Sequence, residues 1–273
     1  MSGTLYIIGT PIGNMEDITL RQLRMLAEVG FICAEDTRVT LKLLTRYEIK
    51  NELVSFHQHS SRAEAQHIID RILAGEDCGV VTDAGMPCIS DPGEVLVRLA
   101  YDNGIDVRAV PGPSAVVTAA ALSGMHLSRF TFEGFLSVNK KERTEQLEQL
   151  RSETGAMIFY EAPHKLRTTL ADLADFFGAD RHISICREIT KLHEETLRLT
   201  LGEAVRIYTE TEPRGEYVLV VEGSSSEGGE VTLEQALEQV RKLIEMGEKP
   251  TDACKAVAKE TGFRKGELYS ALQ

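Results

Sequence analysis

The sequence predicts an α/β fold: two α/β domains with a ligand-binding cleft between them, followed by a small helical extension at the C-terminus. Short apolar runs alternate with helical patterns over residues 1–123, and strand patterns follow one another closely over 124–223. Gly223–Glu230 has the composition of a flexible linker, and helical patterns resume after it. We therefore expect domains at 1–123 and 124–223, with a linker and helical extension at 224–273.

Length, charge and composition limit the classes of protein to which this chain can belong. A chain of 273 residues with 42% hydrophobic residues is long enough for about two globular domains. The net charge of −12 opposes nucleic-acid binding over the whole surface, so an RNA partner must meet a local basic patch. The absence of Trp and an aromatic content of 6% leave little material for base stacking, which disfavours a single-strand-binding module.

The sequence also indicates a cellular compartment. The N-terminal residues lack a charged leader and a long apolar run, and no later run approaches the length of a membrane span. The five cysteines show no CxxC spacing, and their odd number disfavours a disulfide framework. We expect a cytoplasmic protein that has reduced thiols and does not associate with membranes.

Strands and helices alternate in the first half. Thr19 can cap a helix that ends near Gly30, because apolar residues recur after it at helical spacing. Expected strands lie at Thr4–Ile8, Phe31–Ala34, Leu53–Phe56, Cys78–Thr82 and Val107–Val110. The other expected helices lie at Val39–Tyr47, Ala63–Ala74, Glu94–Asn103 and Ser114–Leu122. This alternation predicts a parallel sheet with helices on both faces.

The second half has a different order of elements. Expected strands lie at Phe130–Phe135, Ala156–Tyr160, Ile183–Ile189, Thr196–Leu199 and Tyr217–Glu222. Expected helices lie at Lys140–Arg151, Lys165–Phe177, Gly202–Tyr208 and Leu233–Glu245. Strands so close in sequence favour antiparallel pairs within a mixed sheet. The last residues, 251–273, resemble a helix-turn-helix with its turn at Thr261–Phe263.

Several polar or glycine-rich loops fall at strand ends. Four of them belong to one edge of the first sheet: Thr10–Asn14, Glu35–Arg38, Asp83–Pro92 and Pro111–Ala115. A fifth, Glu161–His164, belongs to the second domain, so a cleft between the domains is the expected ligand site. Neither GxxxxGK[ST] nor GxGxxG occurs, which excludes the common phosphate-binding loops and argues against nucleotide hydrolysis as the function.

Several candidate functional residues also have an interpretation that involves no function. Glu35, Asp36 and Arg38 form either a functional polar group at the cleft or a salt-bridged turn. Ser114 is expected to cap a helix or bond a ligand, because no nucleophile elbow surrounds it. His57, His59 and His67 are read as solvated rather than metal-binding, since no other ligand type completes a set.

Basic residues in the second domain are the candidates for contacts with RNA phosphates. The alternative is that these residues serve only to keep the surface soluble. They are Lys140, Lys141, Arg143, His164, Lys165 and Arg167.

Six motifs taken together carry a resemblance. They are GTPIGNMEDITLR, AEDTR, TDAGMPCISDPG, PGPSA, FYEAPHK and REITKLHEE, in this order. As a set they closely resemble the tetrapyrrole methylase superfamily of S-adenosylmethionine-dependent methyltransferases. Within it they look like the branch that methylates a cytidine ribose 2′-hydroxyl in small-subunit (16S) ribosomal RNA.

The resemblance implies two α/β domains with the methyl donor, S-adenosylmethionine, between them, no metal, and a homodimer. It implies small-subunit ribosomal RNA, free or in the assembled subunit, as the partner. The positions that match donor-binding residues of the family are Pro11, Gly85, Met86, Pro87, Ile89, Ser114, Ala115, Glu161 and Ala162. Many tetrapyrrole methylases have GDP where this chain has Gly85-Met86-Pro87, with its acids at Asp83 and Asp91 instead. This departure favours the RNA branch.

For catalysis we expect Glu35, Asp36 and Arg38, with Lys191 as an outside candidate, to orient the target nucleotide or handle the hydroxyl proton. The alternatives are a methyltransferase of the same fold acting on a tetrapyrrole or a protein side chain, and a non-catalytic nucleic-acid-binding regulator. The regulator is supported only by the helix-turn-helix-like tail and its basic residues, which are Lys255, Lys259, Arg264 and Lys265.

Overall fold

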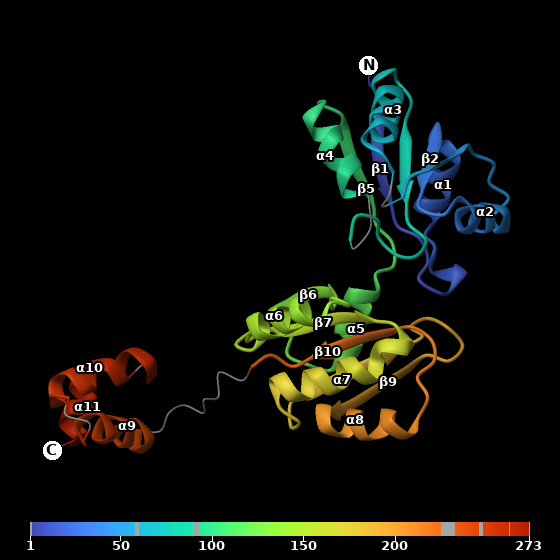
Figure 1. Cartoon of the computed structure of the whole chain (residues 1–273). Helices are drawn as coiled ribbons and strands as arrows, with labels where there is room; N and C mark the ends of the chain where they lie inside the picture. Colours follow the sequence, from blue (N-terminus) through green and yellow to red (C-terminus); the bar gives the residue numbers. More distant parts are fainter. Residues whose placement is uncertain are drawn as a thin grey trace.

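The computed structural model contains two five-stranded sheets and a C-terminal group of three helices (Figure 1). It describes residues 2–57, 60–89, 93–224, 233–245, 248–261 and 263–272. His59, Asp91 and most of the expected linker, residues 225–230, lie outside the described residues. The predicted fold class is confirmed.

The first sheet is entirely parallel, as the alternation of elements predicted. Its strand order is β3-β2-β4-β1-β5, and all four neighbouring pairs run parallel. The strands are β1 (Thr4–Ile8), β2 (Phe31–Ala34), β3 (Leu53–Ser55), β4 (Cys78–Val81) and β5 (Asp106–Val110). Because the strands run the same way, the loops that follow them gather along one edge of the sheet.

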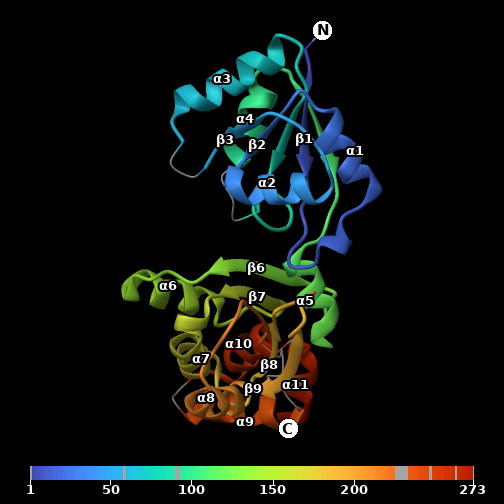
Figure 2. The same cartoon turned by 90° about the vertical axis from the view of Figure 1, so that its right-hand side faces the viewer.

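Helices cover both faces of this sheet (Figure 2). One face packs on α3 (Arg62–Leu73) and α4 (Glu94–Asp102), and the other packs on α1 (Leu20–Glu28) and α2 (Thr37–Arg46). Successive strand residues alternate between the two cores, as the pleat of a strand requires. Thr19 does cap α1, in a capping box with Gln22.

The second sheet is mixed, as predicted. Its order is β6-β7-β10-β8-β9, in which β6 and β7 are parallel and the other pairs are antiparallel. The strands are β6 (Phe130–Phe135), β7 (Ala156–Glu161), β8 (His182–Arg187), β9 (Glu195–Thr200) and β10 (Tyr217–Val221). One face is covered by α6 (Lys140–Leu150), α7 (Pro163–Phe177) and α8 (Leu201–Glu210).

Helix α5 (Ala115–Ser123) packs on the other face of the second sheet. Its small residues Ala119 and Ala120 share a core with Val218 and Val220 of β10. The expected boundary at residue 123 assigns α5 to the first domain, whereas its contacts join it to the second sheet. Ile12, from the loop after β1, belongs to the same core and thereby ties the first unit to the second.

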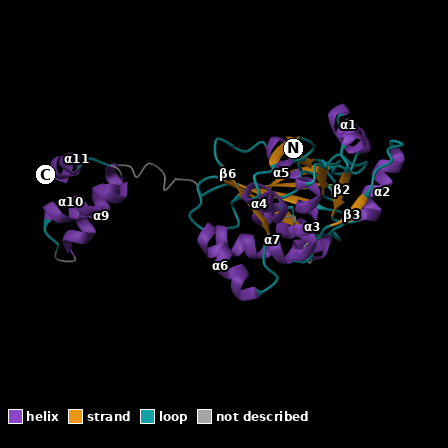
Figure 3. Ribbon diagram, turned by 90° about the horizontal axis from the view of Figure 1, so that it is seen from above, coloured by secondary structure: helices purple, strands orange, loops and turns teal. Residues whose placement is uncertain are grey.

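The C-terminal helices form a small core of their own and are drawn apart from the sheets in Figures 1 and 3. They are α9 (Leu233–Glu245), α10 (Pro250–Thr261) and α11 (Lys265–Leu272). Cys254 and Val257 are among the residues buried at their centre. Across the described part of the chain, every helix is too short or too polar to cross a membrane.

Candidate functional site

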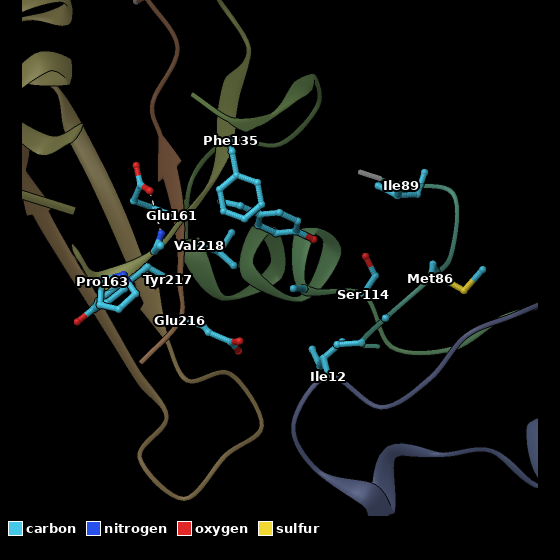
Figure 4. Close-up of a pocket in the computed structure, with 15 residues that line it drawn as sticks. Ile12, Met86, Ile89, Ser114, Phe135, Glu161, Pro163, Glu216, Tyr217 and Val218 are labelled. Atoms are coloured by element: carbon cyan, nitrogen blue, oxygen red, sulfur yellow. Dashed lines mark hydrogen bonds between the residues drawn. The ribbon is translucent and has the colours of Figure 1, made fainter. Parts of the chain in front are cut away.

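A pocket with a volume of about 480 Å³ lies between the loops of the first sheet and the strands of the second (Figure 4). This size suits a small organic ligand. The first unit and the start of α5 supply Ile12, Ala84, Gly85, Met86, Ile89, Ser114 and Ala115. The second sheet and the loops at its strand ends supply Phe135, Tyr160, Glu161, Ala162, Pro163, Glu216, Tyr217 and Val218.

The wall from the first unit is held in place by close backbone contacts at glycines. Thr10 and Gly85 exchange hydrogen bonds of 2.9 and 3.2 Å between N–H and carbonyl groups, which joins the loops after β1 and β4. Gly85 has a φ of +90°, a conformation that residues with a Cβ rarely adopt. Gly9 and Gly112 approach so closely that a Cβ built on Gly9 would lie 2.8 Å from the Gly112 Cα.

Ser114 stands at the N-cap position of α5 without making a side-chain cap hydrogen bond. Of its two expected roles, the side-chain cap is therefore not made, and Ser114 lines the pocket, where a hydrogen bond to a ligand stays a prediction. The first N–H groups of a helix have no partner within it, so the start of α5 can also offer backbone donors here.

The wall from the second sheet is built from side chains of β6, β7 and β10. Behind it lies a buried polar chain: the Glu161 carboxylate accepts hydrogen bonds from Ala162 N–H, at 2.8 Å, and from the Thr169 hydroxyl. Arg143 in turn donates to Thr169 Oγ1 at 3.0 Å and to Asp172 at 2.5 Å. Glu161 thus lines the pocket while its carboxylate is held by the interior of its own domain.

Lys191 contacts both units beside the pocket. Its Nζ donates to Glu188 Oε1 at 2.8 Å and to the pocket residue Glu216 at 2.7 Å. Burial alone would lower the pKa of Lys191, but these two carboxylates raise it above its usual value. The aliphatic part of Lys191 packs on Gly13, where a Cβ would lie 2.6 Å from the lysine Cγ.

The candidates after β2 form a polar cluster next to the pocket rather than part of its lining. Arg38 pairs with Asp36 at 2.6 Å, and the hydrogen bonds from Arg38 lower the pKa of Asp36 to about 2. Asp36 N–H donates to Asp83 at 3.2 Å, and Thr82 donates to Glu35 at 2.7 Å. Burial, followed by the Glu35 charge, raises the pKa of Asp83.

Seven of the nine predicted donor-binding residues line the pocket; Pro11 and Pro87 do not. Their role in binding a donor stays a prediction. The sequence reasoning missed Phe135, Tyr160, Glu216 and Val218, among others. These lie on or beside strands, where only the register of the sheet decides which side chains face the pocket.

One of the predicted phosphate contacts is wrong, and a second has bonds within its own domain. Arg143 is buried and bonded to Asp172 and Thr169, and the Arg167 guanidinium donates to the carbonyls of Tyr208 and Thr211 near the end of α8. The Arg143 guanidinium cannot reach an RNA phosphate without breaking its bonds, whereas Arg167 is exposed and its contact with phosphate stays a prediction. Lys140, Lys141 and His164 are exposed, and Lys165 is half-buried.

Comparisons with known proteins agree with this architecture. The sequence profile of the tetrapyrrole (corrin/porphyrin) methylases matches residues 4–205. The ribosomal RNA small subunit methyltransferase I of Halalkalibacterium halodurans is 44% identical, over 98% of this chain and 94% of that protein. The protein of the same name from Thermotoga maritima is 45% identical over 221 residues, which are 81% of this chain and 99% of that protein.

Solved structures with the same fold are more distant in sequence. A diphthine synthase matches with a TM-score of 0.63 and 14% identity, over 81% of this chain and 90% of that one. The uroporphyrin-III C-methyltransferase of Thermus thermophilus, complexed with S-adenosyl homocysteine, matches with a TM-score of 0.57 and 16% identity, over 81% of this chain and 97% of that one. At this level of identity the likeness concerns the fold alone.

Proposed function

Since this chain belongs to the tetrapyrrole (corrin/porphyrin) methylase family, we propose that it transfers a methyl group from S-adenosylmethionine to small-subunit ribosomal RNA. The observation that carries the proposal is identity of 40 to 45% to several proteins named ribosomal RNA small subunit methyltransferase I. We further propose that the acceptor is the 2′-hydroxyl of a cytidine ribose. The enzyme then acts in the cytoplasm, where small subunits are found.

The chemistry of the pocket supports this donor. The described lining residues include no Lys, Arg or His, and of the two acidic ones Glu161 is bonded inside its domain and Glu216 is paired with Lys191. Such a lining disfavours a ligand rich in phosphate and is compatible with the positive sulfonium of the donor. The free N–H groups at the start of α5 and the Ser114 hydroxyl can bind the polar groups of the donor.

The transfer requires alignment more than it requires a reactive side chain. The sulfonium activates its own methyl group, so the protein has to hold the ribose oxygen in line with it and to accept the hydroxyl proton. Lys191 has a raised pKa and is protonated at neutral pH, so it suits positioning rather than proton abstraction. Asp36, with a pKa of about 2, is a weak base. Asp83, with a raised pKa and a place beside Ala84 of the lining, is the better-matched acceptor.

A blocked pocket tests donor binding. Ala115→Phe places a ring in the pocket, and we expect the affinity for S-adenosylmethionine, measured by calorimetry, to fall at least tenfold. Val117→Phe on the same helix is the control, because Val117 is 62% exposed and is not among the lining residues. Equal affinity in the two variants would place the donor elsewhere.

Labelled S-adenosylmethionine tests the acceptor. The wild-type protein is incubated with naked RNA or with small subunits, and the modified nucleotide is mapped. We expect one 2′-O-methylated cytidine, with turnover reduced in Asp36→Asn and Arg38→Ala. Wild-type turnover in both variants would remove these residues from the site. Methylation of a tetrapyrrole or a protein instead of RNA would overturn the proposed substrate.

In the proposed function the C-terminal helices assist RNA binding and do not take part in donor binding. About a fifth of this chain has no counterpart in the Thermotoga maritima relative, which is matched almost completely. We expect removal of residues 224–273 to weaken binding to RNA while donor affinity stays the same. Light scattering of the wild-type protein tests the expected homodimer.

A further inference from the structure

We propose that Phe135 and Tyr160 form a stacking platform for the base of the target nucleotide, at the mouth of the donor pocket. The inference rests on the proposed function, because it assigns the place of the RNA substrate in the same site. A flat aromatic surface binds any base through its π-face, so the platform holds the nucleotide while other contacts select it.

Three rings come together at this point. The Tyr160 ring lies 4.9 Å from that of Phe132, edge to face, and 5.5 Å from that of Phe135, measured between centroids. Phe132 is half-buried in the core behind the pocket, whereas Phe135 is 55% exposed. Phe132 therefore supports the Tyr160 ring from the core. Phe135 contacts Tyr160 and is exposed on the pocket side.

A bulge in β6 is what brings Phe135 to this face. Residues three apart on a regular strand point to opposite faces. Phe132 pairs with Ile158 and Phe135 pairs with Tyr160, and these partners are only two apart on β7. The extra residue on β6 thus places both phenylalanines on the same face, and Gly134 takes a φ of +66° next to it. Bulges commonly redirect a side chain beside a functional site.

The position of Phe135 suits the acceptor better than the donor. Phe135 and Ile89 face each other across the pocket from the two domains in Figure 4, and Ile89 is 51% exposed. They mark the side open to solvent, through which an RNA nucleotide must enter. Ile89 is one of the predicted donor-binding residues, and the other six that line the pocket are less exposed than Ile89 or Phe135, which favours a donor deeper in the pocket.

Basic residues lie close in the sequence to both rings of the platform. Lys140 and Lys141 begin the helix that follows β6, five residues beyond Phe135. His164 and Lys165 follow Pro163, which lines the pocket. The lysines among them are the candidates for contacts with the phosphates that flank a stacked base, although the chain as a whole carries a charge of −12.

Replacement of the exposed ring is the main test. In Phe135→Leu we expect the KM for RNA, or for small subunits, to rise about tenfold through lost stacking, while the affinity for S-adenosylmethionine stays within twofold. Phe130→Leu is the matched control, because Phe130 lies on the same strand, is 42% exposed and does not line the pocket. An unchanged KM for RNA, or weaker donor binding in place of a higher KM, would overturn the proposal.

A register test follows from the bulge. Gly134→Val disfavours the positive φ and should turn Phe135 away, with a higher KM for RNA. Deletion of Glu133 from that variant removes the extra residue, so that Phe135 faces Tyr160 again without a bulge. We expect the KM to recover. Failure to recover in a folded protein would contradict the platform.

Fluorescence gives a direct readout of stacking. The chain has no Trp, so Phe135→Trp introduces a single reporter. Its emission should be quenched by RNA in the presence of S-adenosyl homocysteine, and not by S-adenosyl homocysteine alone; the opposite pattern would assign the ring to the donor. If the wild-type protein methylates no RNA, the proposed function fails. If it does so and Phe135→Leu behaves as wild type, only the platform fails.

Discussion

The two walls of the pocket are built in different ways. The wall from the first unit consists of loops at the carboxyl ends of parallel strands, where Gly9, Gly85 and Gly112 let backbone segments approach closely. The wall from the second unit consists of side chains on a mixed sheet, of which Phe135, Tyr160 and Val218 are examples.

Because of this difference, the two walls suit different ligands. The loops of the first wall approach so closely at their glycines that substitutions there are disfavoured, so this wall keeps one shape. It suits an invariant ligand such as the methyl donor. A wall of strand side chains changes with each substitution and with each shift of register, so it suits the contacts that distinguish one acceptor from another.

The largest effect is expected from a substitution at the close backbone contact between Gly9 and Gly112 in the first wall. In Gly9→Ala the new Cβ would lie 2.8 Å from both the N and the Cα of Gly112, and neither backbone atom can move freely. We expect a loss of about 3 kcal/mol in the free energy of unfolding and at least a tenfold loss of donor affinity. Denaturant unfolding and calorimetry measure the two.

Gly266→Ala is the control for that variant, because nothing lies within 4 Å of a Cβ built at Gly266 in α11. It should leave donor affinity unchanged. Should Gly9→Ala keep wild-type donor affinity, the wall from the first unit would not be the donor side.

A smaller effect is expected where the two walls meet. Lys191→Met keeps the aliphatic stem over Gly13 but leaves Glu188 and Glu216 without their cation. We expect a loss of about 1 to 2 kcal/mol at neutral pH. The exposed pair between Lys242 and Glu238 is the control, and Lys242→Met should cost only about 0.3 to 0.5 kcal/mol.

The pH dependence of Lys191→Met checks the cause. Because the folded pKa of Lys191 is raised above 10.5, its contribution is complete below that pH and disappears as the pH rises through the folded value. The difference between wild type and variant should therefore shrink only above pH 10.5. A difference that stays constant at higher pH would show that packing, and not charge, is responsible.

The smallest effect concerns the exposed pair beside the pocket. The folded pKa of Asp36 is about 2, below its usual 3.8, so its stabilising contribution is present above pH 3.8 and is lost as the pH falls toward 2. Melting temperatures from pH 5 to 2 should fall less steeply for Asp36→Asn than for wild type. Arg38→Ala should reduce the slope in the same way, and an unchanged slope in both variants would refute the ion pair.

Much of the fold and one side of the site follow from the sequence. The alternation of apolar runs and helical patterns indicated the parallel sheet, since strands linked by helices have to run the same way. Glycines and polar residues at strand ends, such as Gly85 and Ser114, marked one wall of the pocket, because the carboxyl ends of parallel strands share an edge.

The tertiary structure decided which side chains face the pocket and which are buried. Phe135 faces the pocket only because one extra residue in β6 shifts its pairing with β7, and such a shift moves a side chain to the other face. Arg143 looked like a phosphate ligand on a charged helix, yet it is buried against Asp172 and Thr169. Local sequence determined the elements and their order, whereas register and burial depend on partners distant in the chain.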